Sequence, residues 1–326
     1  GATSYDTPEM ARTLEPERED LARAVAETGR YAASAFVESP TFGGGSWLAH
    51  SSLMTGTTIK DNGVYNLLLT QRRDSLPRRF ERSGYRAVAM MPGLKQAWPE
   101  GSFYGFNRTY GAADLEYRGP EFGWWRIPDQ YTLAKLDELE ISRASRPPLF
   151  VFFPTISTHI PFRPTAPYQP DWRRVLGPEP FPSDALAASL AQEPEWTHLS
   201  PGYVGALAYT FEYWAGYLRY RPDANFVLIL IGDHQPASSV SGEGARWDVP
   251  IHVISKRRDI VEALERAGFS AGFNPDPKPL GPMSGLAKLL LDDFEGVAPA
   301  RSTDSGDPAP GATSAAASAS ATAAAR

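Results

Sequence analysis

One apolar segment near the end of the chain constrains the fold more than any other feature of the sequence. Residues 226–231 read Phe-Val-Leu-Ile-Leu-Ile, and the polar residues begin abruptly at Gly232. An uninterrupted apolar run of this length is typical of a strand that is buried on both faces of a parallel sheet. Such strands carry ligand-binding residues at their carboxyl ends. We therefore expect residues 232–236 to lie in a crevice that binds a ligand.

Further apolar runs alternate with amphipathic stretches along the chain. This alternation is typical of an α/β fold, in which helices cover both faces of a mostly parallel central sheet. The expected strands are residues 33–37, 85–91, 149–153, 226–231 and 249–254. The expected helices are residues 17–28, 75–83, 131–139 and 203–220. In the last helix one aromatic stripe is expected to pack against the sheet, because apolar residues recur at spacings of three and four: Tyr203, Leu207, Phe211, Trp214 and Leu218. The stretch 93–130 shows little periodicity and is expected to be a long excursion near the strand ends.

The composition limits the domain count and the partners. The chain has 326 residues, of which 42% are hydrophobic, and this suffices for one large domain, which we assign to residues 1–297. Residues 298–326 are almost entirely Ala, Ser, Thr, Pro and Gly and are expected to form a disordered tail. The net charge of -6 argues against nucleic acid as a partner. Cysteine is absent, so any metal must be held by oxygen and imidazole ligands.

The first candidate site follows the strand 226–231. Asp233 offers an anionic oxygen and His234 an imidazole nitrogen, a pair that suits zinc, manganese or a similar divalent ion. The alternative is a turn stabilised by the Asp side chain, with an incidental histidine. On the residues alone, both interpretations remain open.

A second candidate site is the segment 41–46, which reads Thr-Phe-Gly-Gly-Gly-Ser. Three successive glycines allow the backbone to approach a ligand closely, and Ser46 then begins an expected helix whose free N–H groups favour an anion. A hydroxyl at this place is well situated to attack phosphorus or sulfur. The alternative is a flexible turn in which Ser46 only caps the helix.

A third candidate is His159, which follows the expected strand 149–153. A histidine at the carboxyl end of a strand can bind an oxyanion or protonate a leaving group, although a single loop histidine is more often structural. Lys95 and Trp98, in the aromatic stretch 93–130, are candidates for contacts with a phosphate and with a head group or sugar. Their alternative is a surface lysine and a packed tryptophan.

Taken together and in this order, the three motifs resemble the sulfatase-like branch of the alkaline phosphatase superfamily, closest to lipoteichoic acid synthases and phosphoethanolamine transferases. The resemblance implies that Asp233, His234 and Ser46 bind a metal and that Ser46 is the nucleophile, with Thr41 as a weaker rival. Leu48 and His50 stand where the sulfatase maturation motif has Pro and Arg, so formylglycine is not expected.

The same resemblance implies that His159 assists catalysis at the substrate phosphate. It also assigns four residues to substrate binding, namely Thr41, His50, Lys95 and Trp98. The implied cofactor is one divalent ion, either Mn, Zn, Mg or Ca. The implied reaction is transfer or hydrolysis of a phosphate ester of a phospholipid head group or cell-envelope glycan, through a covalent Ser intermediate. The alternatives are a sulfuric ester hydrolase and a divergent domain that binds without catalysis.

The family places a further metal-binding carboxylate at the end of the first sheet strand, upstream of the nucleophile. No such strand precedes residues 1–6, which read as its immediate continuation. We therefore expect the sequence to be truncated at its N-terminus, without that strand and its ligand, and this fragment to be weakly active or inactive. The resemblance also implies a membrane-anchored parent whose domain faces the outside of the cell, although the given sequence is itself expected to be soluble.

Overall fold

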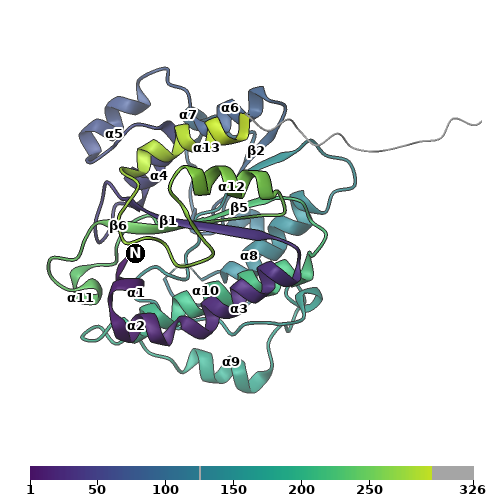
Figure 1. Cartoon of the computed structure of the whole chain (residues 1–326). Coiled ribbons are helices and arrows are strands. Elements are labelled where there is room, and N and C mark those ends of the chain that lie inside the picture. The colour runs from purple at the N-terminus through teal and green to yellow at the C-terminus, as the bar shows by residue number, and fades with distance from the viewer. Residues whose placement is uncertain (125, 296–326) are drawn as a thin grey trace, which may run out of the picture.

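The computed structural model of the protein describes residues 1–124 and 126–295. The expected tail, residues 298–326, lies outside the described residues. Figure 1 shows a middle layer that contains β1, β5 and β6, with α3 and α10 on one side and α12 and α13 on the other. The predicted α/β class, with helices on both faces of the strands, is therefore confirmed.

The strands form two separate sheets. The first has the order β5-β6-β1-β7, and all its neighbouring strands are antiparallel. Its strands are β1 (Tyr31–Glu38), β5 (Val227–Ile231), β6 (Asp248–Ser255) and β7 (Ser270–Ala271). The second has the order β3-β2-β4 and is parallel. Its strands are β2 (Arg86–Met90), β3 (Arg108–Tyr110) and β4 (Leu149–Phe152).

All five expected strands are present, within two residues of their predicted ends. The structure differs from the expectation in sheet organisation, because the predicted parallel arrangement holds for β2, β3 and β4 only. Alternating burial specifies that a segment is a strand, but it does not specify the direction of the neighbouring strand. The short strand β3 was not predicted, because it is brief and lies within the aromatic stretch 93–130.

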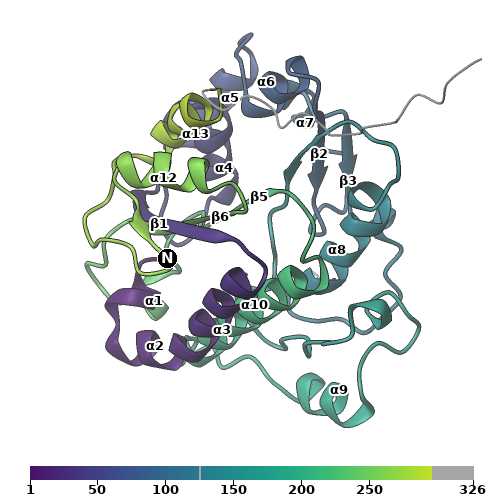
Figure 2. The same cartoon turned by 45° about the vertical axis from the view of Figure 1, so that its right-hand side comes forward.

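The strands β4 and β5 each pair with a single neighbour, β2 and β6 respectively, so each has one unpaired edge. Every residue of both strands is only half-buried, although the two sequences are entirely apolar. Figure 2 shows β2 and β3 set apart from β1, β5 and β6. The half-burial is consistent with the expected missing strand, which stays a prediction.

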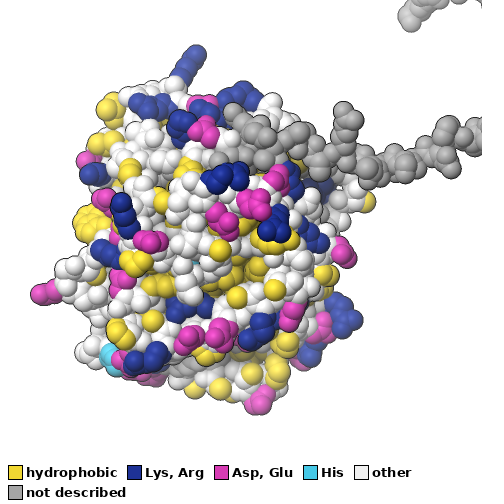
Figure 3. Space-filling model, viewed as in Figure 1, with side chains coloured by type: hydrophobic (Ala, Val, Ile, Leu, Met, Phe, Trp, Pro, Cys, Tyr) yellow, Lys and Arg dark blue, Asp and Glu magenta, His cyan; other side chains and the backbone are white. Residues whose placement is uncertain are grey.

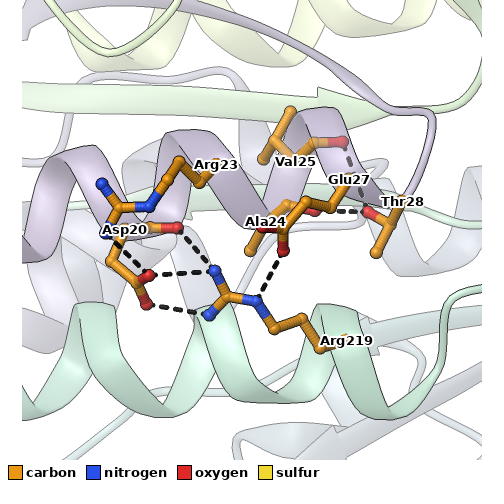
Figure 4. Close-up of polar contacts among 7 residues, drawn as sticks. All are labelled: Asp20, Arg23, Ala24, Val25, Glu27, Thr28 and Arg219. Atoms are coloured by element: carbon orange, nitrogen blue, oxygen red, sulfur yellow. Dashed lines mark hydrogen bonds and ion pairs between the residues drawn. The ribbon is translucent and has the colours of Figure 1, made fainter.

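The first helices of the chain are α1 (Thr3–Asp6), α2 (Pro8–Thr13) and α3 (Glu15–Glu27), and α3 packs against the long helix α10 (Ser200–Tyr220). Arg219 of α10 reaches across to α3 (Figure 4). Its Nη1 lies 2.9 Å from Asp20 Oδ2, and its Nε lies 2.8 Å from Glu27 Oε2. These groups are exposed to solvent, so the apolar contacts between the helices contribute most of the stability. Of the aromatic stripe expected on α10, Phe211, Trp214 and Leu218 are buried in this core, and Tyr203 is buried in a separate smaller cluster.

The other α-helices surround the two sheets. They are α4 (Ser46–Thr55), α5 (Asn62–Leu69), α6 (Leu76–Arg82), α7 (Gly101–Tyr104), α8 (Asp129–Leu136), α9 (Ser183–Leu190), α11 (Ser238–Ser241), α12 (Arg258–Arg266) and α13 (Leu286–Glu295). Single turns of tighter or wider helix occur at Ala113–Leu115, Asp137–Ile141, Trp172–Arg174 and Met283–Gly285. Within the described part of the chain, none of the helices combines the length and the hydropathy needed to cross a bilayer.

Candidate active site

The residues that follow β5 and those that begin α4 meet at one place. Ser46 Oγ lies 3.1 Å from His234 Nε2, and this nitrogen lies 3.4 Å from Asp233 Oδ2. These residues are separated by about 190 positions in the sequence and come from two of the three predicted motifs. The structure therefore brings the predicted nucleophile and the two predicted metal ligands together.

The glycine turn before α4 allows this close approach. Gly43 has a φ of 70°, and its N–H donates to the carbonyl of Gln235 at 3.0 Å. A Cβ atom at residue 43 would lie 3.3 Å from Ala237 Cα, so a side chain there would push the two turns apart. Gly45, with a φ of 81°, precedes Ser46 and provides no side-chain cap. The first N–H groups of α4 therefore remain available to an anion.

Two buried polar residues hold the turns in register. Ser39 Oγ donates to the carbonyl of Asp233 at 2.6 Å and accepts the N–H of Thr41 at 3.3 Å. The Gln235 side chain accepts the N–H of Thr3 at 3.3 Å and donates to the carbonyl of Arg246 at 2.8 Å. Sequence reasoning missed both roles. The one available signal was that both residues lie within or next to the motifs. Nothing else in the local sequence distinguishes them from solvent-exposed loop residues.

The orientation of His234 leaves one ring nitrogen facing Ser46. His234 Nδ1 lies 2.7 Å from the carbonyl oxygen of Gln235, and only a protonated Nδ1 can donate there. The lone pair is therefore on Nε2. Burial alone would raise the pKa of Asp233, but the nearby His234 and His50 rings and the Ser46 hydroxyl lower it below its ordinary value. Asp233 is thus an anion next to an imidazole lone pair, as a divalent metal requires.

His50 lies one turn further along α4 than Ser46. Its ring meets Phe152 of β4 edge to face, with the ring centroids 5.2 Å apart. Burial lowers the pKa of His50, while the charge of Asp233 opposes that effect. The ring is therefore neutral at pH 7, and it links the nucleophile helix to the end of β4. Its predicted contact with substrate stays a prediction.

His159 lies on the loop that follows β4, as expected, and it is exposed. A fully buried carboxylate, Asp129, holds this loop by accepting the N–H groups of Ile156 at 2.8 Å and Ser157 at 2.9 Å. His159 Nδ1 lies 2.6 Å from the carbonyl oxygen of Ile160, and the ring lies beside that of Trp124, 5.4 Å between centroids. The role of His159 toward a substrate stays a prediction.

The remaining predicted substrate contacts have different environments. Thr41 is buried within the glycine turn, and its hydroxyl has no hydrogen-bond partner among the described residues. Trp98 stacks on Tyr104 with 5.6 Å between centroids and is half-buried, so part of its surface is already used in packing. Lys95 is exposed in the loop after β2. The predicted contacts of Thr41, Trp98 and Lys95 with a substrate stay predictions.

A further residue at this place is Tyr203, which sequence reasoning assigned to the aromatic stripe of α10. Its hydroxyl accepts a hydrogen bond from the terminal nitrogen of Gly1 at 3.0 Å. Burial, together with the charge of Asp233, raises the pKa of Tyr203. Tyr203 therefore contributes a neutral hydroxyl close to Asp233. The helical spacing of the stripe is the same for core and site residues, so the sequence carries no signal for this role.

The donor set suits a metal but is small. Asp233, His234 and Ser46 supply a carboxylate oxygen, an imidazole nitrogen and a hydroxyl oxygen at the same place. The described residues contain no group of three or more His, Asp or Glu side chains that could hold a metal. The three residues therefore fit one divalent ion as part of its ligand set, and they leave positions open for substrate or for a further ligand.

The fold, with the Ser46 turn beside the Asp233-His234 pair, is that of a sulfatase-like domain. The chain belongs to the sulfatase family, whose model matches residues 23–251. This match spans the Ser46 turn, His159 and the Asp233-His234 pair. No curated protein is detectably similar in sequence.

Three solved structures are similar to this chain. The lipoteichoic acid synthase LtaP from Listeria monocytogenes has 14% identity and a TM-score of 0.48, over 74% of this chain and 59% of that one. An alkaline phosphatase superfamily protein from Vibrio parahaemolyticus has 15% identity and a TM-score of 0.49, over 72% and 54%. The phosphoglycerol transferase GacH from Streptococcus pyogenes, in complex with sn-glycerol-1-phosphate, has 11% identity and a TM-score of 0.52, over 86% and 81%. The likeness to GacH supports the fold alone.

Proposed function

We propose that this domain transfers or hydrolyses phosphate esters through a covalent intermediate on Ser46. The observation that carries the proposal is the 3.1 Å approach of Ser46 Oγ to His234 Nε2, at a helix start that has no side-chain cap. The nucleophile, a group that can hold its proton or a metal, and a binding site for an anionic oxygen thus lie at one place in the structure.

Each residue of the site has a separate role in the proposed reaction. Asp233, His234 and Ser46 would hold one divalent ion, either Mn, Zn, Mg or Ca, and this ion would lower the pKa of the hydroxyl and polarise the substrate. Ser46 Oγ releases its proton to water and attacks phosphorus in line, and a phospho-Ser forms while the bond to the leaving oxygen breaks. The N–H groups of α4 bind the phosphate oxygens, and His159 protonates the leaving oxygen. Water or an acceptor alcohol then takes the phosphoryl group from Ser46.

The phosphate ester is favoured over a sulfate ester by the residues around Ser46. Leu48 and His50 replace the Pro and Arg that sulfatase maturation requires, and Leu48 is buried in an apolar cluster with Ile59 and Leu68. Ser46 therefore remains an unmodified serine. The GacH complex contains a phosphorylated glycerol, and by analogy we propose a phospholipid head group or cell-envelope glycan, with Thr41, His50, Lys95 and Trp98 in contact with it.

The small ligand set supports one competing function, a divergent domain that binds without catalysis.

We propose that a further carboxylate ligand belongs on a strand between β4 and β5, where both edges are unpaired and the apolar side chains are half-buried. We also propose that the domain works outside the cytoplasm as part of a membrane-anchored protein.

The test compares the wild type with Ser46→Ala, using bis(p-nitrophenyl) phosphate and p-nitrophenyl sulfate in the presence of Mn²⁺. We expect weak turnover of the phosphate ester only, and the loss of that turnover in Ser46→Ala. Ser183→Ala is the matched control, because Ser183 also begins a helix, α9, but lies outside the site. Equal turnover in the wild type and Ser46→Ala would contradict the nucleophile assignment. Wild-type protein without turnover or bound metal would support the binding domain.

A further inference from the structure

An apolar surface patch begins at the residue after the nucleophile. Trp47 is 48% exposed, Val64 is 40% exposed and Leu67 is 59% exposed. Val64 and Leu67 lie three positions apart on α5 and therefore share one helix face. The Trp47 ring is fastened to the start of α5, because its Nε1 donates to Asn62 Oδ1 at 3.1 Å. We call Trp47, Val64 and Leu67 the α4–α5 patch.

The α4–α5 patch is not required for packing. Helix α5 already buries Leu68 in a small cluster with Leu48 and Ile59, while Val64 and Leu67 stay exposed beside it. A surface helix normally presents polar residues to solvent, yet α5 also exposes Val64 and Leu67. Exposed apolar residues gathered in this way mark sites of interaction with a partner or a membrane. In Figure 3, hydrophobic side chains reach the surface at the upper left, where α5 lies.

The segment that carries α5 has a local positive charge. Residues 57–73 contain three basic residues, Lys60, Arg72 and Arg73, and one acidic residue, Asp61, so their net charge is +3 − 1 = +2 in a chain of charge -6. Asp61 caps α5 by accepting the N–H of Val64 at 2.9 Å. Arg73 Nη1 donates to Thr57 Oγ1 at 2.8 Å, which closes the ends of the segment on each other. Lys60 and Arg72 are exposed and lie on the same segment of chain as Val64 and Leu67.

We propose that the α4–α5 patch docks on an anionic lipid surface. Tryptophan favours the boundary between water and the lipid interior, while Lys and Arg favour anionic head groups. A second copy of the chain fits less well, because a symmetric interface would place Lys60 and Arg72 against the same residues of the other copy. Docking on lipid does not itself depend on the proposed function. It rests on that function only for its purpose, because docking would present a lipid-borne phosphate ester to Ser46.

The test measures co-sedimentation of the full chain with two kinds of vesicle, pure phosphatidylcholine and an equimolar mixture of phosphatidylcholine and phosphatidylglycerol. We expect the wild type to bind the mixed vesicles more tightly, and Val64→Ser/Leu67→Ser to lower the partition coefficient by about tenfold. Leu190→Ser is the matched control, because Leu190 is 43% exposed on α9 and lies outside the patch. Lys60→Gln/Arg72→Gln should remove the preference for the anionic vesicles.

Three outcomes would overturn the proposal. They are an absence of wild-type binding, an equal partition coefficient for the wild type and the double Ser variant, and an equal loss in Leu190→Ser. Self-association that depends on Val64 and Leu67 in sedimentation velocity, without vesicle binding, would instead identify a second copy as the occupant. Turnover of the water-soluble phosphate ester should be unchanged in the double Ser variant, and Ser46→Ala should still bind vesicles. A failure of the docking proposal can therefore be distinguished from a failure of the proposed catalytic function.

Discussion

The buried histidine of β6 makes the stability of the fold depend on pH in a calculable way. His252 is 3% exposed, its Nδ1 lies 2.6 Å from Ser34 Oγ, and its Nε2 lies 3.1 Å from Tyr5 OH. Burial, with the positive charges of Arg18 and the N-terminus as smaller contributions, lowers its pKa from 6.5 to about 3. With both ring nitrogens hydrogen-bonded, His252 is a satisfied core histidine.

The sign of the effect follows from the unfolded chain. Below pH 6.5 the unfolded chain takes up a proton at His252, whereas the folded protein holds the ring neutral until about pH 3. The free energy of unfolding therefore falls as the pH decreases between these two values. At pH 5, which is 1.5 units below the ordinary pKa, the loss from this residue is about 2 kcal/mol. Such a loss is a large share of the stability of a typical domain.

The assay is urea unfolding at pH 7 and pH 5, monitored by tryptophan fluorescence. The decrease in unfolding free energy between these pH values should be smaller by about 2 kcal/mol in His252→Gln than in the wild type. His198→Gln is the matched control, because His198 is exposed and its removal should leave the pH dependence unchanged. The same pH dependence in His252→Gln and in the wild type would refute the reasoning. If His252→Gln does not fold, an NMR titration of the wild-type ring that gives a pKa near 6.5 would refute it equally.

Two further predictions concern buried carboxylates. Asp129→Asn removes one of the two carboxylate oxygens that accept hydrogen bonds from the loop before His159. We therefore expect faster proteolysis of residues 154–161 and a loss of about 2 kcal/mol in unfolding free energy. Asp114→Asn, at an exposed turn, is the control and should show neither effect. Glu140→Gln breaks a buried pair with Arg86 and should cost about 3 kcal/mol, whereas Arg219→Ala breaks exposed pairs and should cost less than about 1 kcal/mol. Equal melting temperatures for Glu140→Gln and Arg219→Ala would contradict this ranking.

The sequence alone determined the parts of the site that depend on local chemistry. The apolar run 226–231 predicted a strand, and the polar residues after it predicted Asp233 and His234 at its carboxyl end. The three glycines predicted a close backbone approach, and the structure has Gly43 against residue 237 and Ser46 at the first position of α4. These features could be predicted because burial periodicity and glycine conformations act over a few neighbouring residues.

Only the tertiary structure decided which distant residues meet. Ser39 and Tyr203 make contacts at the site that span about 190 or more positions, and no local pattern marks them. The antiparallel pairing of β1, β5 and β6 was also unpredictable, because a period of two describes a strand without giving the direction of its neighbour. The pKa of His252 likewise depends on the burial that β1, α1 and β6 create together. Each of these properties depends on the path of the whole chain, which local periodicity does not encode.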